Sequence, residues 1–130
     1  MLRKFIVANV AAVAIGGVAL AQNVTPPSAT PAPAYLIAHV QVTDPEGWKQ
    51  YLAALPSTLA PYHVKVLARA PGIAVDASTP PPGSTAILAF NTMDDLKAWW
   101  NSPAYQAIIP LREKSAKTIV YAVPGLPPAP

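Results

Sequence analysis

The chain has 130 residues, the length of a single domain, and shows no internal repeat. It contains no cysteine, which excludes a disulfide scaffold, a thiolate metal site and a cysteine nucleophile. The chain has nine lysines and arginines and six acidic residues. Because Arg3 and Lys4 belong to an N-terminal targeting segment, the rest of the chain carries seven basic and six acidic residues. This near-neutral balance, without a basic stripe, gives no indication of nucleic-acid binding.

Residues 1–21 have the pattern of a secretory signal peptide. A basic start is followed by an almost wholly apolar run over residues 5–20, and Ala19 and Ala21 place small residues where signal peptidase cuts. An uncleaved membrane anchor is the alternative, but the run is shorter than the roughly 20 apolar residues that a spanning helix needs. We therefore expect cleavage after Ala21, a periplasmic or secreted mature chain, and no stable membrane span after cleavage.

Proline-rich segments delimit the folded part of the chain. Residues 22–33 are predicted to be a Pro-rich linker and residues 124–130 a Pro-rich tail, because proline among small residues favours an extended, unpacked chain. One α+β domain is therefore predicted over residues 34–123.

The domain is expected to begin with a strand over residues 35–42, which are rich in Tyr, Ile and Val. The period of two puts Leu36 and Val40 on a fully apolar face, and Ile37 and His39 on a mixed face. The mixed face is therefore expected to be covered only in part, or by a partner.

A helix is predicted to follow from Pro45. Thr43 and Glu46 have the spacing of a capping box, and proline is tolerated in a first helical turn. An apolar stripe at helical spacing continues the segment and comprises Trp48, Tyr51, Leu52 and Leu55.

Two further strands are predicted after this helix. The first covers residues 64–70 and ends at a Pro-Gly turn at 71–72, after which residues 73–75 can continue the pairing. Residues 76–83 are predicted to be a loop, and residues 85–90 the next strand.

The last part of the domain is predicted to be helical and then extended. Asn91 or Thr92 caps the helical segment, residues 102–103 look like a fresh cap and helix start, and residues 117–123 form a last strand. The apolar face expected for the first helical piece comprises Met93, Leu96 and Trp100.

The predicted order is therefore β-α-β-β-α-β, which is typical of the ferredoxin-like α+β fold. That fold has a four-stranded antiparallel sheet with two helical segments on one face. The opposite face is predicted to be apolar in part, and a symmetric homodimer is the usual way to cover such a face.

Several short segments, in a fixed order along nearly the whole folded part, resemble a known family. They are residues 35–38 (YLIA), 42–46 (VTDPE), Tyr51, Tyr62, Lys65, Arg69, Phe90, Met93, 97–100 (KAWW), 101–106 (NSPAYQ) and 111–112 (LR). On these segments the chain resembles the DUF1330 family of the dimeric α+β barrel superfamily. The resemblance implies the fold and a homodimer. It implies no activity, although related branches include cofactor-free monooxygenases and heme-binding enzymes.

The sequence departs from that family at two places. Family members usually have Gly-Gly at the helix–strand turn where this chain has His63-Val64. Because Val64 does not readily adopt a positive φ, a locally different turn is expected. The strand position of His39 is often acidic in relatives, so any function of a carboxylate there is lost.

His39 and Arg69 are the candidates for chemistry, with Tyr51, Trp100 and Tyr105 as further candidates for the same ligand pocket. A mid-strand His39 near Arg69 has the character of a base, and the alternative is a hydrogen-bonded histidine at a dimer interface. Arg69 is suited to binding a carboxylate or enolate oxygen, or to pairing with an acidic side chain for structure. The aromatic residues either line that pocket or complete the core.

No metal site or cofactor is predicted, because the two histidines lack a carboxylate cluster and no phosphate-binding fingerprint is present. Three functions remain open. The first is an exported homodimer that binds a small organic molecule. The second is a cofactor-independent monooxygenase- or isomerase-like enzyme in which His39 is the base and Arg69 stabilises an oxyanion. The third is a structural or interaction protein without a ligand.

Overall fold

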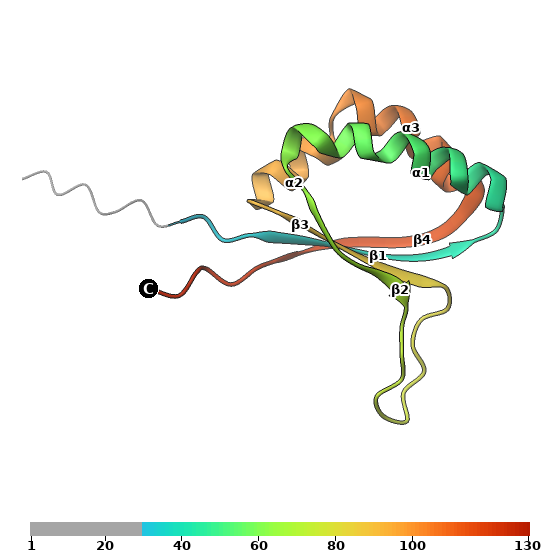
Figure 1. The fold of residues 1–130 in the computed structure, drawn as a ribbon, viewed down its shortest axis with the longest axis horizontal. Coiled ribbons are helices and arrows are strands. Elements are labelled where there is room, and N and C mark those ends of the chain that lie inside the picture. The colour runs from blue at the N-terminus through green and yellow to red at the C-terminus, as the bar shows by residue number, and fades with distance from the viewer. Residues whose placement is uncertain (1–29) are drawn as a thin grey trace, which may run out of the picture.

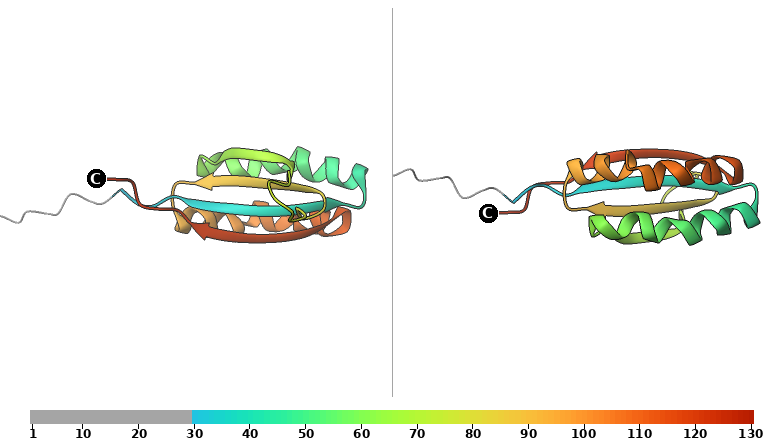
Figure 2. Two further views of the ribbon diagram at one scale, coloured as in Figure 1. Left: turned by 90° about the horizontal axis from the view of Figure 1, so that it is seen from below. Right: turned by 90° about the horizontal axis from the view of Figure 1, so that it is seen from above.

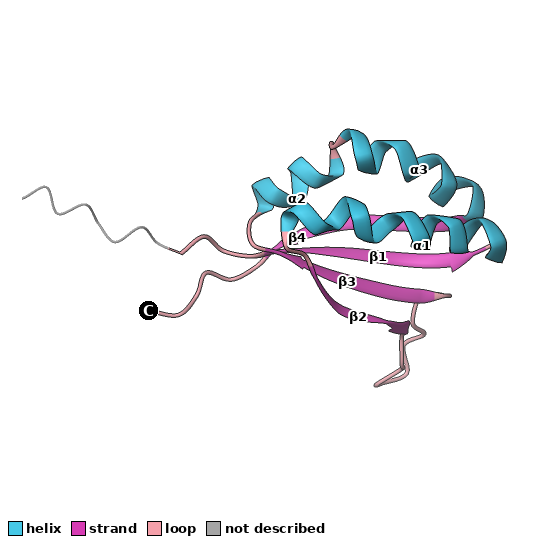
Figure 3. Ribbon diagram, turned by 45° about the horizontal axis from the view of Figure 1, so that its top comes forward, coloured by secondary structure: helices cyan, strands magenta, loops and turns pink. Residues whose placement is uncertain are grey.

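A four-stranded antiparallel sheet forms the base of the fold, which the computed structural model describes for residues 30–130. Its strands lie in the order β2-β3-β1-β4, with bounds β1 Ala34–Val42, β2 Lys65–Pro71, β3 Ser84–Phe90 and β4 Ala116–Pro124. The helices α1 (Pro45–Leu59), α2 (Met93–Trp100) and α3 (Pro103–Ser115) all lie on one face (Figure 1, Figure 3). This is the ferredoxin-like α+β arrangement that the order of elements predicts.

The predicted signal peptide, and residues 22–29 of the predicted linker, lie outside the described residues. Residues 30–33 form neither helix nor strand, and the backbone N–H of Gly125 donates to the carbonyl of Pro33 at 2.7 Å. The two ends of the domain therefore lie side by side at one end of the sheet (Figure 1). None of the helices within residues 30–130 has the length and apolarity that crossing a bilayer requires.

The register of the central strand β1 decides which side chains face the helices. Leu36 pairs with Leu88, and His39 pairs with Thr85, on β3. Because side chains alternate along a strand, the first pair faces the helices and the second faces the open side. The predicted separation of an apolar and a mixed face in β1 is therefore observed.

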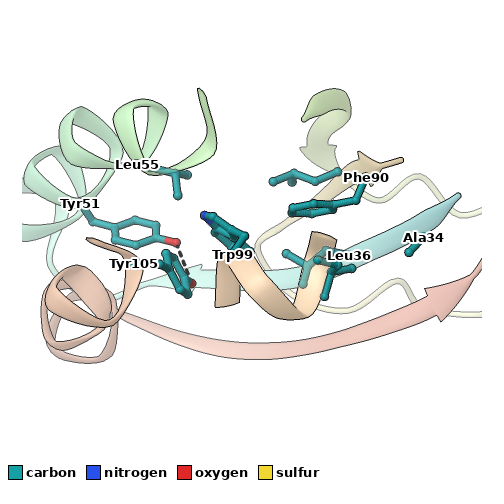
Figure 4. Close-up of a cluster of buried hydrophobic side chains, with 9 residues drawn as sticks. Ala34, Leu36, Tyr51, Leu55, Phe90, Trp99 and Tyr105 are labelled. Carbon is teal, nitrogen blue, oxygen red and sulfur yellow. Dashed lines mark hydrogen bonds between the residues drawn. The ribbon is translucent and has the colours of Figure 1, made fainter. Parts of the chain in front are cut away.

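An aromatic cluster fills the space between α2, α3 and the sheet. Phe90, Trp99 and Tyr105 are each only 1% exposed, and the ring centroids of Trp99 and Tyr105 are 4.0 Å apart (Figure 4). The indole Nε1 of Trp99 donates a hydrogen bond to the hydroxyl of Thr58 at 3.1 Å. The expected apolar face of α2 was wrong in one residue, because Trp99 and not Trp100 is the buried tryptophan. Trp99 and Trp100 are three and four residues from Leu96, so both can lie on the same helix face as Leu96. Only the tertiary packing decides which of the two tryptophans is buried.

Helix α1 is capped by Asp44 and not by Thr43 as predicted. The carboxylate of Asp44 accepts from the backbone N–H of Glu46 at 3.1 Å. The backbone N–H groups of Thr43 and Asp44 instead donate to the carbonyl of Ser115, which ties the start of α1 to the end of α3. The predicted caps of the later helices are confirmed, since the hydroxyls of Thr92 and Ser102 accept from the N3 backbone N–H of α2 and α3.

The turn from α1 into β2 contains a left-handed residue. A short 3-10 helix, η1 (Ala60–Tyr62), ends at His63, whose φ and ψ are 52° and 39°. Val64 does not adopt a positive φ, as expected, and His63 takes the left-handed conformation at this turn. A non-glycine residue in that conformation costs about 1–2 kcal/mol.

The connection between β2 and β3 projects away from the helices, beyond the open face of the sheet (Figure 1, Figure 2). The prediction that residues 73–75 continue the strand pairing was wrong. Ile73 and Val75 are instead 87% and 99% exposed. Gly83 returns the chain to the sheet with a φ of 83°.

Candidate functional site

A cavity of about 100 Å³ lies between the sheet and the helices α1 and α3. Its walls are mainly apolar, with Leu36 and Leu88 from the strands and Leu52 and Leu55 from α1. An engineered apolar cavity of roughly 150 Å³ binds benzene, so this volume suits a small molecule or part of a larger one. The cavity is therefore a candidate binding site at the place where two layers of the fold meet.

A wider groove of about 320 Å³ adjoins this cavity under the C-terminal half of α1 and along β2. Leu52, Leu55 and Arg69 line both spaces. The two spaces therefore share a wall that includes Arg69.

Two tyrosine hydroxyls meet above the cavity. The hydroxyls of Tyr51 on α1 and Tyr105 on α3 lie 3.3 Å apart in a hydrogen bond, and both side chains are buried (Figure 4). Burial raises the pKa of Tyr51 far above its usual value, and the neighbouring Tyr105 raises it further. The positive charges of Arg112 and Arg69 act in the opposite direction, so both guanidinium groups lie close enough to influence this hydroxyl.

Arg112 is a buried cation at the cavity wall. Its side chain is 8% exposed, and its Nη1 donates to the hydroxyl of Tyr105 at 3.3 Å. The guanidinium carbon lies 5.2 Å from the centre of the Trp100 ring, which is a cation–π contact. Within residues 30–130 its Nε has no hydrogen-bond partner. A buried arginine nitrogen without a hydrogen-bond partner is unusual in a protein interior.

Arg112 was not among the residues predicted for the site. The available signal was its position: it continues the helical spacing of Tyr105, Ile108 and Ile109 on α3, so a charged residue stands on an apolar stripe. Such a position does not by itself predict a buried charge, because the long arginine stem can carry the guanidinium to solvent.

Arg69 faces the helices because β2 contains a bulge. The register of β2 against β3 shifts between Val66 and Ala68, so Arg69 pairs with Ala86 on the helix side. Arg69 is exposed and forms no salt bridge in the part of the chain that the structure describes.

Glu46 and Asp76 are the acidic residues predicted as structural partners for Arg69, and both are engaged elsewhere. Glu46 forms a 2.9 Å ion pair with Lys49, and the carboxylate of Asp76 accepts from the backbone N–H of Ser78 at 2.7 Å. The hydrogen bond from Ser78 lowers the pKa of Asp76, which is fully exposed.

His39 lies on the open face of the sheet, away from this cavity. Its Nδ1 shares a hydrogen bond of 3.0 Å with the hydroxyl of Thr85, and its Nε2 shares one of 3.4 Å with the hydroxyl of Tyr121. The sheet therefore separates His39 from Arg69.

Of the five predicted site residues, three share the cavity: Tyr51, Arg69 and Tyr105. Trp100 packs against Tyr105 and Arg112, behind the cavity wall. No cluster of three or more His, Cys, Asp or Glu side chains that could hold a metal ion occurs among residues 30–130.

Solved structures with a similar fold include proteins without known function and one oxygenase. A protein of unknown function from Rhodopseudomonas palustris superposes with a TM-score of 0.60 at 12% identity, covering 75% of this chain and 85% of that one. SnoaB, a cofactor-independent oxygenase from Streptomyces nogalater, gives 0.53 at 9% identity, with 76% and 98% covered. A dimeric ferredoxin-like protein of unknown function from Thermobifida fusca gives 0.51 at 15% identity, with 74% and 92% covered. At these identities the likeness concerns the fold alone.

No functionally curated protein matches the sequence. The family model of a domain of unknown function, DUF1330, matches residues 33–126, which include every strand and helix of the fold. The chain therefore belongs to the DUF1330 family.

Proposed function

We propose that this protein binds a small organic molecule in the cavity between α1, α3 and the sheet. One observation carries the proposal: polar groups from Tyr51, Arg69, Tyr105 and Arg112 converge on an otherwise apolar cavity. Binding sites for small molecules typically combine apolar walls with a few placed polar groups that fix orientation.

Filling the cavity tests this proposal. Ala86 lines the cavity from β3, so Ala86→Leu inserts a side chain into the space that a ligand would occupy. Isothermal titration with uncharged probes, cyclohexanol and benzyl alcohol, is expected to show saturable binding to the wild type. In Ala86→Leu the affinity is expected to fall about tenfold or more, the scale that pocket shape controls.

Ala53→Leu on the exposed side of α1 is the matched control, because it adds the same atoms outside the cavity. It is expected to bind the probes like the wild type. Failure of both probes to bind the wild type, or equal binding by Ala86→Leu, would contradict a binding function for the cavity.

The protein is further proposed to form a homodimer, in which two chains pack through the open faces of their sheets. Ile119, Tyr121 and Val123 on β4 are 65%, 45% and 42% exposed there, and an apolar patch of this kind favours a partner. The similar protein from Thermobifida fusca is described as dimeric. Light scattering after size exclusion is expected to give twice the chain mass for the wild type and the single mass for Ile119→Glu. A monomeric wild type would remove the homodimer from the proposal.

We also propose that the protein is exported and cleaved after Ala21, on the pattern of residues 1–21. The intact mass of the protein from the periplasm or medium is expected to lack these residues. A full-length chain in the cytoplasm would refute export.

An oxygenase- or isomerase-like reaction in which His39 and Arg69 cooperate finds no support in the geometry of one chain. The two side chains lie on opposite faces of the sheet, and His39 bonds to Thr85 and Tyr121. The likeness to SnoaB concerns the fold, and a fold does not determine an activity.

A further inference from the structure

We propose that the ligand of this cavity is a small organic anion, a carboxylate on an apolar body, whose charge is neutralised by Arg112. This inference rests on the proposed function, because it names the chemical class that the same cavity takes. It is carried by the charges and contacts around Arg112.

The chain supplies no counter-charge for Arg112. Its six acidic residues all fall within the described part and lie at or near the surface; they are Asp44, Glu46, Asp76, Asp94, Asp95 and Glu113. The one ion pair found within residues 30–130 joins Lys49 to Glu46 on the exposed side of α1. A buried cation normally has a partner, because removal from water is costly when nothing replaces the lost solvation. The folded domain therefore provides no anion to neutralise Arg112.

The surroundings of Arg112 orient its guanidinium for such an anion. The Trp100 ring packs against the guanidinium plane, and the hydroxyl of Tyr105 accepts from Nη1. The Nε–H remains without a partner in the described chain. Arg112 also lines the cavity. A planar guanidinium matches the two oxygens of a carboxylate better than it matches a neutral acceptor.

A second positive charge stands at the other side of the cavity. Arg69 lines both the cavity and the adjoining groove, and no Asp or Glu among residues 30–130 lines either space. Two cations without an acidic neighbour favour an anion and disfavour an amine or a metal cation. The hydroxyl of Tyr51, hydrogen-bonded to that of Tyr105, adds a further polar group at the same cavity.

The shape of the site limits the rest of the ligand. About 100 Å³ between apolar walls accommodates a short alkyl chain or a single ring. The geometry therefore selects a compact monocarboxylate rather than a nucleotide or a polyanion.

Matched pairs of probes distinguish a preference for anions from binding to the apolar cavity alone. Pentanoate with pentanamide, and benzoate with benzamide, have nearly the same shape and differ in charge. In calorimetric titrations each carboxylate is expected to bind the wild type about tenfold or more tightly than its amide, since hydrogen bonds to charged groups are the strong ones. Arg112→Met keeps the apolar stem and removes the charge, so it is expected to abolish this preference while changing amide affinity less than about twofold.

Lys114→Met removes a positive charge from the exposed side of the same helix and is the matched control. It is expected to keep the full preference for the carboxylates. Arg69→Met, on a different element, is expected to reduce that preference severalfold, which keeps the proposal testable if Arg112→Met does not fold by circular dichroism.

Equal binding of amides and carboxylates to the wild type would overturn the anionic ligand and leave the cavity as a binding site. A carboxylate preference that persists unchanged in both Arg112→Met and Arg69→Met would also overturn it. Absence of binding by all four probes would overturn the anionic ligand, whereas the binding function of the cavity is tested separately by cyclohexanol and benzyl alcohol.

Discussion

Replacing Trp99 by alanine is expected to lower the free energy of unfolding by about 3–5 kcal/mol, the usual cost of removing a large buried aromatic side chain. Trp99 is 1% exposed and packs against Phe90 and Tyr105, with ring centroids 5.4 and 4.0 Å away. Its loss also leaves the buried hydroxyl of Thr58 without the indole N–H that donates to it. The substitution therefore combines a large cavity with a broken buried hydrogen bond.

Trp100→Ala is the matched control, because it removes the same side chain one position further along the same helix. Trp100 is only partly buried, so the expected loss is about 1–2 kcal/mol. Both values come from urea unfolding at one protein concentration, since dimerisation adds to apparent stability. A loss for Trp99→Ala no larger than that for Trp100→Ala would contradict the placement of Trp99 in the core.

Replacing Gly83 by alanine is expected to destabilise the domain by about 2–4 kcal/mol. A methyl group at this position would overlap the backbone carbonyl oxygen of Val40, which belongs to the central strand and cannot easily move. The φ of 83° also lies in the region that disfavours side chains. The steric overlap and the backbone strain therefore both destabilise the turn that leads into β3.

Gly72→Ala lies at the other end of the same loop and serves as the control. Its added methyl group would meet mainly Pro80, a residue of the projecting loop that can shift. Its expected loss is below about 1 kcal/mol, as is usual for surface changes. If the two substitutions cost the same in urea unfolding, the described conformation of Gly83 is incorrect.

The order and faces of the elements could be predicted from the sequence because they follow from local patterns. Alternation in β1 separates Leu36 from His39, and capping residues such as Thr92 and Ser102 mark helix starts. The choice between Trp99 and Trp100 could not be predicted, because both positions lie within one helical stripe and only tertiary packing distinguishes them.

The candidate site depended on a feature that no local pattern shows. Without the bulge between Val66 and Ala68, strict alternation would place Arg69 on the open face beside His39, as the sequence suggested. The extra residue in β2 moves Arg69 to the helix side, where it joins Tyr51 and Tyr105. A bulge in an edge strand arises from pairing with its neighbour, so it becomes visible only in the structure.

Arg112 was visible in the sequence but not interpretable from it. A lone charged residue on an apolar helix stripe can reach solvent by its long stem, and an exposed guanidinium is the more common outcome. The structure shows the opposite, a buried guanidinium bounded by Trp100 and Tyr105. In the proposed complex, a bound organic anion neutralises this charge.

The most direct test is the ¹⁵N-edited NMR resonance of the Arg112 Nε–H, assigned by its loss in Arg112→Lys and followed while benzoate is added to the mature protein. We predict that this resonance shifts and saturates with the same dissociation constant as the backbone amides of α1 and α3 around the cavity. Saturable binding of benzoate that leaves the Arg112 Nε–H unchanged, or no binding, would contradict the claim.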